Sequence, residues 1–256
     1  MFDWRIYLSG LAAMTLLGLG GWIASVIKKN VTLVDSLWSL FFLLATVVYV
    51  SASAEPRALL ILVLVTIWAL RLSIYLTWRN SGKQEDHRYQ AIRQNNQPHF
   101  WLKSLYIVFA LQALLAWIIS LPLLGAATSH QPINWLDYVG ISLWLTGFLW
   151  ESIADRQLAR FKANPANKGA VMDSGLWRYS RHPNYFGECC VWWGYYLLAV
   201  AAGAWWSLPA PLLMTLLLLK VSGVALLEKD IGQRRPAYAA YIAKTNAFLP
   251  GRPHHD

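Results

Sequence analysis

The sequence predicts an all-α, polytopic integral membrane protein, and three observations lead to that fold class. Apolar residues make up 57% of the 256 residues, whereas Asp, Glu, Lys and Arg together make up only 14%. Soluble domains carry about 25% charged residues, so this chain has too few to cover a water-facing surface. It also has 15 Trp and 12 Tyr, the aromatic side chains that favour membrane–water interfaces. This composition excludes a disordered chain, a collagen-like repeat, a disulfide scaffold and an ordinary soluble enzyme.

Five apolar segments are long enough to cross a bilayer, because a hydrocarbon core about 30 Å thick needs about 20 helical residues. They are residues 6–27, 33–54, 58–78, 101–125 and 205–227. The first has no basic stretch before it and no processing site after it, so we expect a retained helix rather than a signal peptide.

Two further segments bring the expected number of transmembrane helices to about seven. Residues 135–150 contain Asp137 and continue into a polar stretch, which predicts a helix that leaves the membrane while still helical. Residues 185–202 contain Glu188 and several aromatic side chains. We therefore expect one membrane domain over residues 1–256. Its two long polar loops are residues 79–100 and 151–184, and its polar tail is residues 228–256.

Basic residues are distributed asymmetrically between these spans. Seventeen of the 22 Lys and Arg lie in the first, third and fifth loops and the C-terminal tail, whereas the N-terminus and the other loops carry only Arg5 and Arg57. Cytoplasmic loops of membrane proteins carry the excess of Lys and Arg. We expect the N-terminus outside, the C-terminus in the cytoplasm, and the protein in a bacterial inner membrane.

The net charge of +9 therefore belongs mainly to one face. Topology and attraction to anionic membrane lipids are enough to explain Lys28 and Lys29. Loops 79–100 and 151–184 mix bases with acids, amides and aromatics, a composition that suits an anionic ligand. Nucleic acid is not an expected partner, because no recognised binding module is present.

Among the ionisable residues within the predicted spans, four stand out, namely Asp35, Arg71, Glu188 and Lys220. Charge is costly in lipid, so such residues are candidates for a functional site. Counted along their helices, all four fall in the cytoplasmic half of the bilayer, which predicts a site open to the cytoplasm. Two other interpretations stay open: Arg71 and Lys220 can snorkel to the interface, and Asp35 and Arg71 can form a structural ion pair.

A polar motif precedes the sixth span, where residues 173–196 read DSGLWRYSRHPNYFGECCVWWGYY. Pro183 and Gly187 are expected to interrupt a regular helix, so the chain should turn as it re-enters the membrane. Arginine offers forked donors to phosphate or carboxylate groups, and Asn184 offers an amide to a heterocycle or carboxamide. An interfacial aromatic belt accounts for the Trp and Tyr residues but not for the Arg-His-Pro-Asn-Tyr run.

RHPNYFGE, preceded by GLWRYS and followed by WWGYY, resembles the membrane reductases of the steroid 5-alpha-reductase and sterol-reductase superfamily. Within it, the chain is most similar to a branch of short proteins with a steroid 5-alpha-reductase C-terminal-like domain. Further matches run along most of the chain: VDSLW at 34–38, RLSIYLTWR at 71–79, EDHRY at 85–89, LQ at 111–112, WESIADRQLARFK at 150–162, SGVALLE at 222–228 and YAAYIAKTNAFLP at 238–250.

The resemblance implies a multi-helix membrane fold that binds NADPH in a pocket open to the cytoplasm and takes a lipophilic substrate from the bilayer. It assigns residues to parts of the cofactor as follows: Asp155, Lys162 and Arg88 to the adenosine and phosphate end, Asn184 and Glu188 to the nicotinamide end, Arg181, His182 and Tyr185 to the turn around the pyrophosphate, and Glu228 and Tyr241 to closure of the pocket. The basic loops independently supply the fixed cations that three phosphate groups need. No G-x-G-x-x-G motif follows a strand, so a Rossmann domain is not expected, and no pair of His or Cys has zinc spacing.

Reduction of an activated C=C bond needs a hydride, a group that polarises the conjugated carbonyl, and a proton. NADPH would supply the hydride. Asp35 lies where the resemblance places a catalytic carboxylate, and a carboxylic acid kept neutral by burial can donate a hydrogen bond to a developing enolate. The steroid reductases pair that acid with a tyrosine from the next helix, where this chain has Trp68, so Tyr75 and Tyr89 are candidate substitutes. A lipid-soluble enone or unsaturated isoprenoid is therefore a better expected substrate than a steroid.

Two other functions remain open at this point. Isoprenylcysteine and phospholipid methyltransferases, which use S-adenosylmethionine, share a similar RHPxYxG turn. Their cofactor carries no phosphate, so the six bases of loop 151–184 and the Glu188 that follows RHPN favour the reductase. A small transporter is compatible with a broken span and intramembrane charges, but no inverted repeat supports it.

Overall fold

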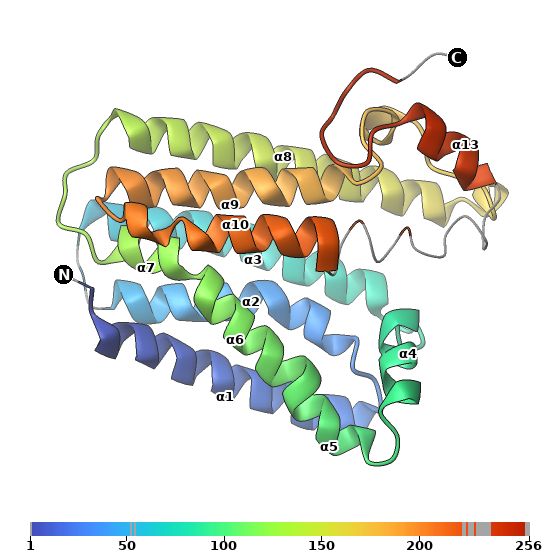
Figure 1. The fold of residues 1–256 in the computed structure, drawn as a ribbon, viewed down its shortest axis with the longest axis horizontal. Coiled ribbons are helices and arrows are strands. Elements are labelled where there is room, and N and C mark those ends of the chain that lie inside the picture. Colours follow the sequence, from blue (N-terminus) through green and yellow to red (C-terminus); the bar gives the residue numbers. More distant parts are fainter. Residues whose placement is uncertain are drawn as a thin grey trace. The chain divides into compact units, whose positions relative to one another are not determined.

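The computed structural model describes residues 2–51, 53, 55–221, 224, 228 and 237–253. All regular elements in these residues are helices, which confirms the predicted all-α class (Figure 1). Contacts divide the chain into two compact units, one of Met1–Ile133 with Ala199–Ser207 and one of Asn134–Leu198 with Leu208–Asp256. Each unit is described by itself below.

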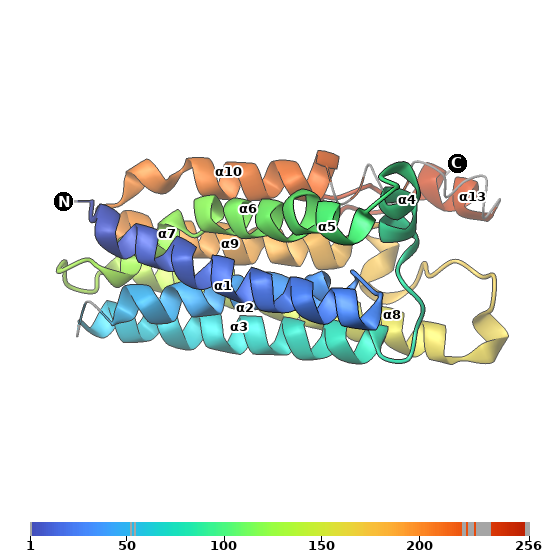
Figure 2. The ribbon, with the colours of Figure 1, turned by 90° about the horizontal axis from the view of Figure 1, so that it is seen from below.

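Four helices are long and apolar enough to cross a membrane, and they coincide with the first four predicted spans. They are α1 (Trp4–Lys28), α2 (Leu33–Val50), α3 (Pro56–Asn80) and the stretch Phe100–Ile119, which comprises α5 (Phe100–Ser104), the π-helical turn η1 (Leu105–Ala110) and α6 (Leu111–Ile119). In the first unit α1, α2 and α3 lie side by side (Figures 1 and 2).

The other three predicted spans are also helical in the described residues, although none of them is among the four helices that are both long and apolar enough to cross a membrane. Residues 135–150 form the first half of α8 (Trp135–Ala163), which continues as one helix into its polar end as predicted. Residues 185–202 lie largely in α9 (Pro183–Ala201), and the last span is a shorter apolar helical stretch, Trp205–Val221. Residues 222, 223 and 225–227 of that predicted span lie outside the described part of the chain.

Short helices complete the described chain. They are α4 (His87–Asn95) and α7 (Leu121–Ala127), the 3-10 turns η2 (Pro165–Asn167), η3 (Gly175–Arg178) and η4 (Trp205–Ser207), α10 (Pro209–Leu216), the π-helical turn η5 (Leu217–Val221) and α13 (Ala237–Lys244). The fourth predicted span ends early, because the helix stops at Ser120 and restarts as α7 with a proline in its first turn. Proline is tolerated at such a start because it lacks only a donor that has no partner there.

The position of Arg57 differs from the prediction, which assigned this residue to the second loop. The sequence placed it outside the third span, whereas the structure places it in the first turn of α3 with only 1% of its surface exposed. Its guanidinium donates to the carbonyl oxygens of Gln131 (2.6 Å) and Pro132 (2.8 Å). These bonds compensate the loss of water around the charge and tie the segment before α8 to the start of α3.

Small residues allow α1 to pack closely in the first unit. Gly10, Gly18 and Gly21 lie with Met14 on its buried face. A Cβ added at Gly10 would come within 2.5 Å of the Tyr49 ring. Close approach through small residues is the usual mode of helix packing in membranes, where dispersion contacts replace the hydrophobic effect.

The opposite face of α1 exposes large apolar side chains at helical spacing, including Leu16 and Ile23, and Ile27 near its end is 76% exposed. Such a continuous apolar stripe is unfavourable in water and favourable against lipid tails. This face, together with the four long apolar helices, supports the prediction that the chain is a membrane protein.

The second unit corrects the prediction that Gly187 interrupts the helix. Pro183 is the first residue of α9, whereas Gly187 lies inside the helix. Its missing side chain is needed for packing instead, because a Cβ there would lie 2.5 Å from the backbone nitrogen of Glu151 on α8. A Cβ added at Gly147 of α8 would likewise lie 2.5 Å from the Gly187 carbonyl oxygen.

Replacing Gly147 by Ala should therefore lower the free energy of unfolding by about 1–3 kcal/mol, the usual cost of overpacking. The measurement is thermal unfolding of the detergent-purified protein. Gly20→Ala is the matched control, since nothing lies within 4 Å of a Cβ at this position on α1, and alanine favours a helix over glycine. Equal melting temperatures for the two variants would contradict the close contact between α8 and α9.

Candidate functional site

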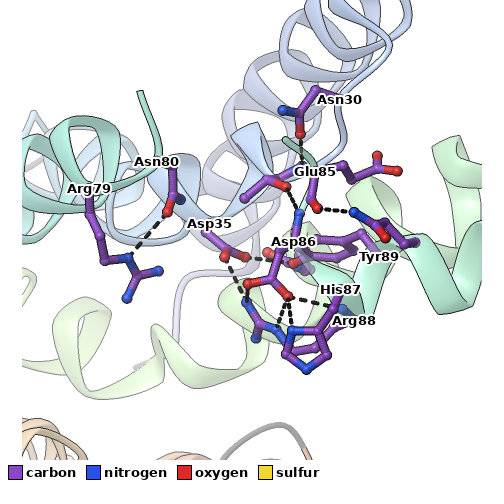
Figure 3. A network of polar contacts seen from close by, with 12 residues as sticks. Asn30, Asp35, Arg79, Asn80, Glu85, Asp86, His87, Arg88 and Tyr89 are labelled. Atoms are coloured by element: carbon purple, nitrogen blue, oxygen red, sulfur yellow. Dashed lines mark hydrogen bonds and ion pairs between the residues drawn. The ribbon is translucent and has the colours of Figure 1, made fainter. Parts of the chain in front are cut away.

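The first unit contains a polar cluster built around Asp35. Asp35 lies in the first turn of α2, and its side chain is 14% exposed. Its carboxylate accepts hydrogen bonds from the guanidinium of Arg88 (2.9 Å) and from the hydroxyl of Tyr89 (2.6 Å), as Figure 3 shows. Both donors come from α4, in the loop that the sequence predicted to bind an anionic ligand.

Local capping places α4 where these contacts form. The Asp86 carboxylate accepts from the backbone nitrogen of Arg88 (3.0 Å), which starts the helix, and short polar side chains are favoured at that position because they satisfy an open backbone donor. The backbone nitrogen of Asp86 in turn donates to the Thr32 hydroxyl (2.8 Å), next to the start of α2. Asp86 also accepts from Arg88 Nε (2.9 Å), so Arg88 is held between two carboxylates.

The environment of Tyr89 keeps its hydroxyl protonated. Burial raises the pKa of Tyr89 well above its usual value, and the Asp35 carboxylate raises it further. The amide of Gln112, from the LQ pair on α6, donates to the Tyr89 oxygen at 3.4 Å. The result is a buried O–H group whose donor and acceptor sides both have partners.

Tyr89 is thus the tyrosine that reaches Asp35. Trp68 is fully buried and packs against the Phe42 ring, 5.9 Å away. The Tyr75 ring lies near the guanidinium groups of Arg71 and Arg79. The sequence contained Tyr89 in the EDHRY motif, but its spacing from Asp35 gave no reason to choose it over Tyr75.

In the second unit, a dense network fixes the RHPN turn. Arg181 donates through Nε (2.7 Å) and Nη2 (2.8 Å) to the Glu228 carboxylate, and through Nη1 to the carbonyl oxygens of Ile242 and Thr245. The His182 ring lies 2.9 Å from Glu228 through Nε2 and stacks on the Tyr185 ring. Arg181 and His182 are both buried.

The C-terminal segment also closes on this turn. The Tyr241 hydroxyl of α13 donates to the carbonyl oxygen of Trp177 and, at 3.3 Å, to that of Ser180. The Ser180 hydroxyl donates to the Phe248 carbonyl oxygen (2.8 Å). Glu228 and Tyr241 therefore meet the turn, as the resemblance implied, through contacts to protein groups.

A polar contact between α8 and α9 joins two of the other predicted residues. The Asn184 amide of α9 donates to the Asp155 carboxylate of α8 at 3.3 Å. Asp155, Glu188 and Glu151 are all buried, and Glu151 stands one turn before Asp155 on α8. Glu151 was not among the predicted site residues, although its i, i+4 spacing from Asp155 in the WESIADRQLARFK motif would have indicated it.

The predicted site residues thus fall into two groups. Asp35 and Arg88 meet in the first unit, where Arg88 binds Asp35 and Asp86. The remaining predicted residues belong to the second unit, in which the exposed Lys162 stands near the end of α8. The partners of Arg88 in its own unit were not foreseen from the sequence.

The all-helical architecture, the long apolar helices and the buried polar clusters define an integral membrane protein with internal charged sites. The chain belongs to the family described as "Protein of unknown function (DUF1295)", whose profile matches residues 21–245. That range contains both clusters.

Two fission yeast proteins (Schizosaccharomyces pombe) are similar to this chain. "Uncharacterized protein C594.04c" is 28% identical over 280 aligned positions, which cover 95% of this chain and 79% of the relative. "Uncharacterized protein C9.08c" is 32% identical over 116 positions, which cover 38% of this chain and 41% of the relative. No solved structure matches significantly.

The Glu228 network predicts a specific pH dependence of stability. Burial alone would raise the pKa of Glu228, but the hydrogen bonds from His182 and Arg181 outweigh it and lower the pKa to about 2, from a usual value of 4.5. A carboxyl group whose pKa is lower in the folded state stabilises the fold above its unfolded value, and this contribution is lost as the pH falls through the folded value. At pH 7, Glu228→Gln should lower the free energy of unfolding by about 1–3 kcal/mol, since it leaves buried donors without their charged acceptor.

The difference in the free energy of unfolding between the wild-type protein and Glu228→Gln should shrink as the pH falls from 4.5 to about 2. Chemical denaturation at a series of pH values measures it. A difference that stays constant over this range would show that the Glu228 carboxylate is not the stabilising species.

Proposed function

We propose that this protein is an NADPH-dependent membrane reductase that reduces an activated C=C bond of a lipophilic substrate, of steroid, sterol or isoprenoid kind. The observation that carries the proposal is the 2.6 Å contact between the Tyr89 hydroxyl and the Asp35 carboxylate. This contact supplies a tyrosine–carboxylate pair of the kind expected from the resemblance. The tyrosine is Tyr89, whereas the resemblance places it at the position of Trp68.

The roles within this pair follow from the direction of its hydrogen bonds. Asp35 accepts from the Arg88 guanidinium (2.9 Å) and from the Tyr89 hydroxyl, so in this proposal Asp35 positions the phenol and does not itself donate to the substrate. The Tyr89 hydroxyl is the group that donates to the substrate carbonyl oxygen and delivers a proton as enolate charge develops there. Arg88 balances the negative charge that remains on the cluster, and solvent restores the proton.

The polar groups of the second unit have the chemistry that a dinucleotide requires. Carboxylates such as Asp155 and Glu188 accept hydrogen bonds from ribose hydroxyls or a carboxamide, and Asn184 can donate and accept. Lys162 is exposed at the end of α8, where a cation suits phosphate groups. NADPH, when bound, supplies the hydride.

Arg181 has a supporting role in this proposal. Its Nε, Nη1 and Nη2 atoms donate to Glu228, Ile242 and Thr245. Arg181, His182 and Tyr185 therefore shape the turn, and Asn184 at the start of α9 is the residue of this motif that meets the cofactor. Glu228 and Tyr241 hold the C-terminal segment against the same turn.

The membrane placement forms part of the proposal. We infer seven spans with the N-terminus outside, a cofactor site open to the cytoplasm, and a substrate that arrives from the bilayer. A bacterial inner membrane remains the predicted location, while the relatives described above come from fission yeast.

Thermal unfolding of the detergent-purified protein with NADPH, NADH or S-adenosylmethionine tests the cofactor. A ligand that binds only the folded state stabilises it by about 2.7 kcal/mol at a hundred times its dissociation constant, so NADPH should raise the melting temperature. Asn184→Ala and Glu188→Gln should each weaken the apparent affinity for NADPH, measured from this rise, by about tenfold. Stabilisation by S-adenosylmethionine alone would favour a methyltransferase and exclude the reductase.

Tyr89→Phe tests the proton donor. Loss of a general acid typically lowers turnover by about 10²–10⁴-fold, measured as NADPH oxidation with a panel of lipophilic enones. The NADPH-induced rise in melting temperature should persist, because Tyr89 is assigned to the substrate. Asp35→Asn should slow turnover in the same way.

Tyr75→Phe is the matched control, since Tyr75 is the other candidate tyrosine and its ring lies near the Arg71 and Arg79 guanidinium groups. If Tyr75→Phe and Tyr89→Phe slowed turnover equally, the assignment of Tyr89 would be wrong.

A further inference from the structure

A partly open hollow of about 350 Å³ lies in the first unit, at the C-terminal end of α1 and the start of α5. Its lining comes from two stretches of chain that are distant in sequence, residues 25–31 and 93–104. The lining residues are Ser25, Val26, Lys29, Val31, Arg93, Gln97, His99, Phe100, Trp101 and Ser104. This hollow takes no part in the reduction proposed above.

Three of the six polar side chains in the lining are basic in type. Lys29, Arg93 and His99 come from the loop after α1, from α4 and from the loop before α5, and no Asp or Glu is among these lining residues. The hydroxyls of Ser25 and Ser104 donate to backbone carbonyl oxygens of their own helices. The side-chain donors that remain in the lining include those of Lys29, Arg93 and His99 and the amide of Gln97.

Arg93 is fixed in place from outside the hollow. Glu85 accepts from its Nε and Nη2 atoms, both at 2.8 Å, and also accepts from the Val31 backbone nitrogen (2.8 Å). The Arg93 guanidinium lies over the Phe100 ring, 4.5 Å from its centroid. Glu85 neutralises the charge of Arg93, so Lys29 supplies the net positive charge of the lining and His99 adds a ring nitrogen that can donate a hydrogen bond.

The position of the hollow matches the depth of lipid headgroups. It lies where two candidate membrane spans, Trp4–Lys28 and Phe100–Ile119, end and begin. Trp101 is 51% exposed, and its carbonyl oxygen accepts from the Trp22 indole nitrogen (2.8 Å) while the two rings stack. Tryptophan favours the membrane–water interface.

We propose that this hollow binds a phosphate group of an anionic ligand through Lys29, Arg93 and His99. Phosphate offers several acceptor oxygens to converging cationic donors, and anionic lipid headgroups attract basic residues near the membrane surface. The phosphate comes either from a phospholipid headgroup or from a soluble phosphate compound. The inference does not depend on the proposed reductase.

Lys29 and His99 can be replaced without damage to the fold. Both are exposed, and both adopt left-handed backbone conformations, with φ of 51° and 65°. Asparagine tolerates this conformation better than most residues, so Lys29→Asn and His99→Asn remove basic groups without adding backbone strain. Lys83→Asn is the matched control, because Lys83 is an exposed base of the same unit outside the hollow.

The experiment measures thermal stabilisation of the full chain in neutral detergent. Four probes are titrated, namely dihexanoyl-phosphatidylglycerol, dihexanoyl-phosphatidylcholine, inorganic phosphate and NADPH. We expect at least one of the phosphatidylglycerol and inorganic phosphate probes to bind, and the double variant Lys29→Asn/His99→Asn to weaken it about tenfold or more. A response to phosphatidylglycerol but not to phosphate identifies a lipid headgroup, and the reverse identifies a soluble phosphate compound.

Three results would overturn the inference. The first is binding of neither probe, or binding that the double variant leaves unchanged. The second is an equal loss in Lys83→Asn, which would reveal a general effect of charge. The third is an equal loss of the NADPH response in the double variant, which would make the hollow part of the cofactor site. Failure of NADPH to bind any of the proteins would count against the proposed reductase alone.

Discussion

Burial of charge is the constraint on which the arrangement of this protein depends. An ionised side chain in an apolar helical interior is stable only when other groups replace the water that it loses. Asp35 at the start of α2 is held by Arg88 and Tyr89 from α4, and Arg181 before α9 is held by Glu228. Each pair joins segments far apart in the chain. These charged residues therefore determine which loop segments pack against the ends of the helices.

The two clusters satisfy this constraint in ways that have different chemical consequences. In the second unit, Arg181 has fixed partners at three of its nitrogen atoms, so the turn that it forms is a rigid support. In the first unit, the Tyr89 proton lies on an O–H group that can turn from Asp35 to another acceptor, and Arg88 remains to balance the charge. The Arg181 network of the second unit therefore suits a structural role, and the Asp35–Tyr89 pair of the first unit suits the proton delivery that we propose.

Local sequence signals predicted the helices well and their interruptions less well. The first four spans follow from hydropathy and length, because a helix that crosses lipid must be apolar over about 20 residues. Gly187 was misread as a helix break, because glycine serves both turns and close helix contacts. Which role applies depends on the neighbour, here the backbone of Glu151 on α8. Arg57 was likewise placed in a loop, since its partners are backbone carbonyl groups whose position no residue type reveals.

The sequence by itself determined the all-helical membrane class, the position of the apolar segments, the polar motif around Asn184 and the candidacy of Asp35. These features depend on composition and on spacing along a single helix. Only the tertiary structure decided that Tyr89 rather than Trp68 or Tyr75 meets Asp35, and that Lys29 gathers with bases from two other segments at one hollow. The reason is physical: a contact between distant segments is set by how their helices pack and cap, and that geometry is not encoded in the spacing of any one segment.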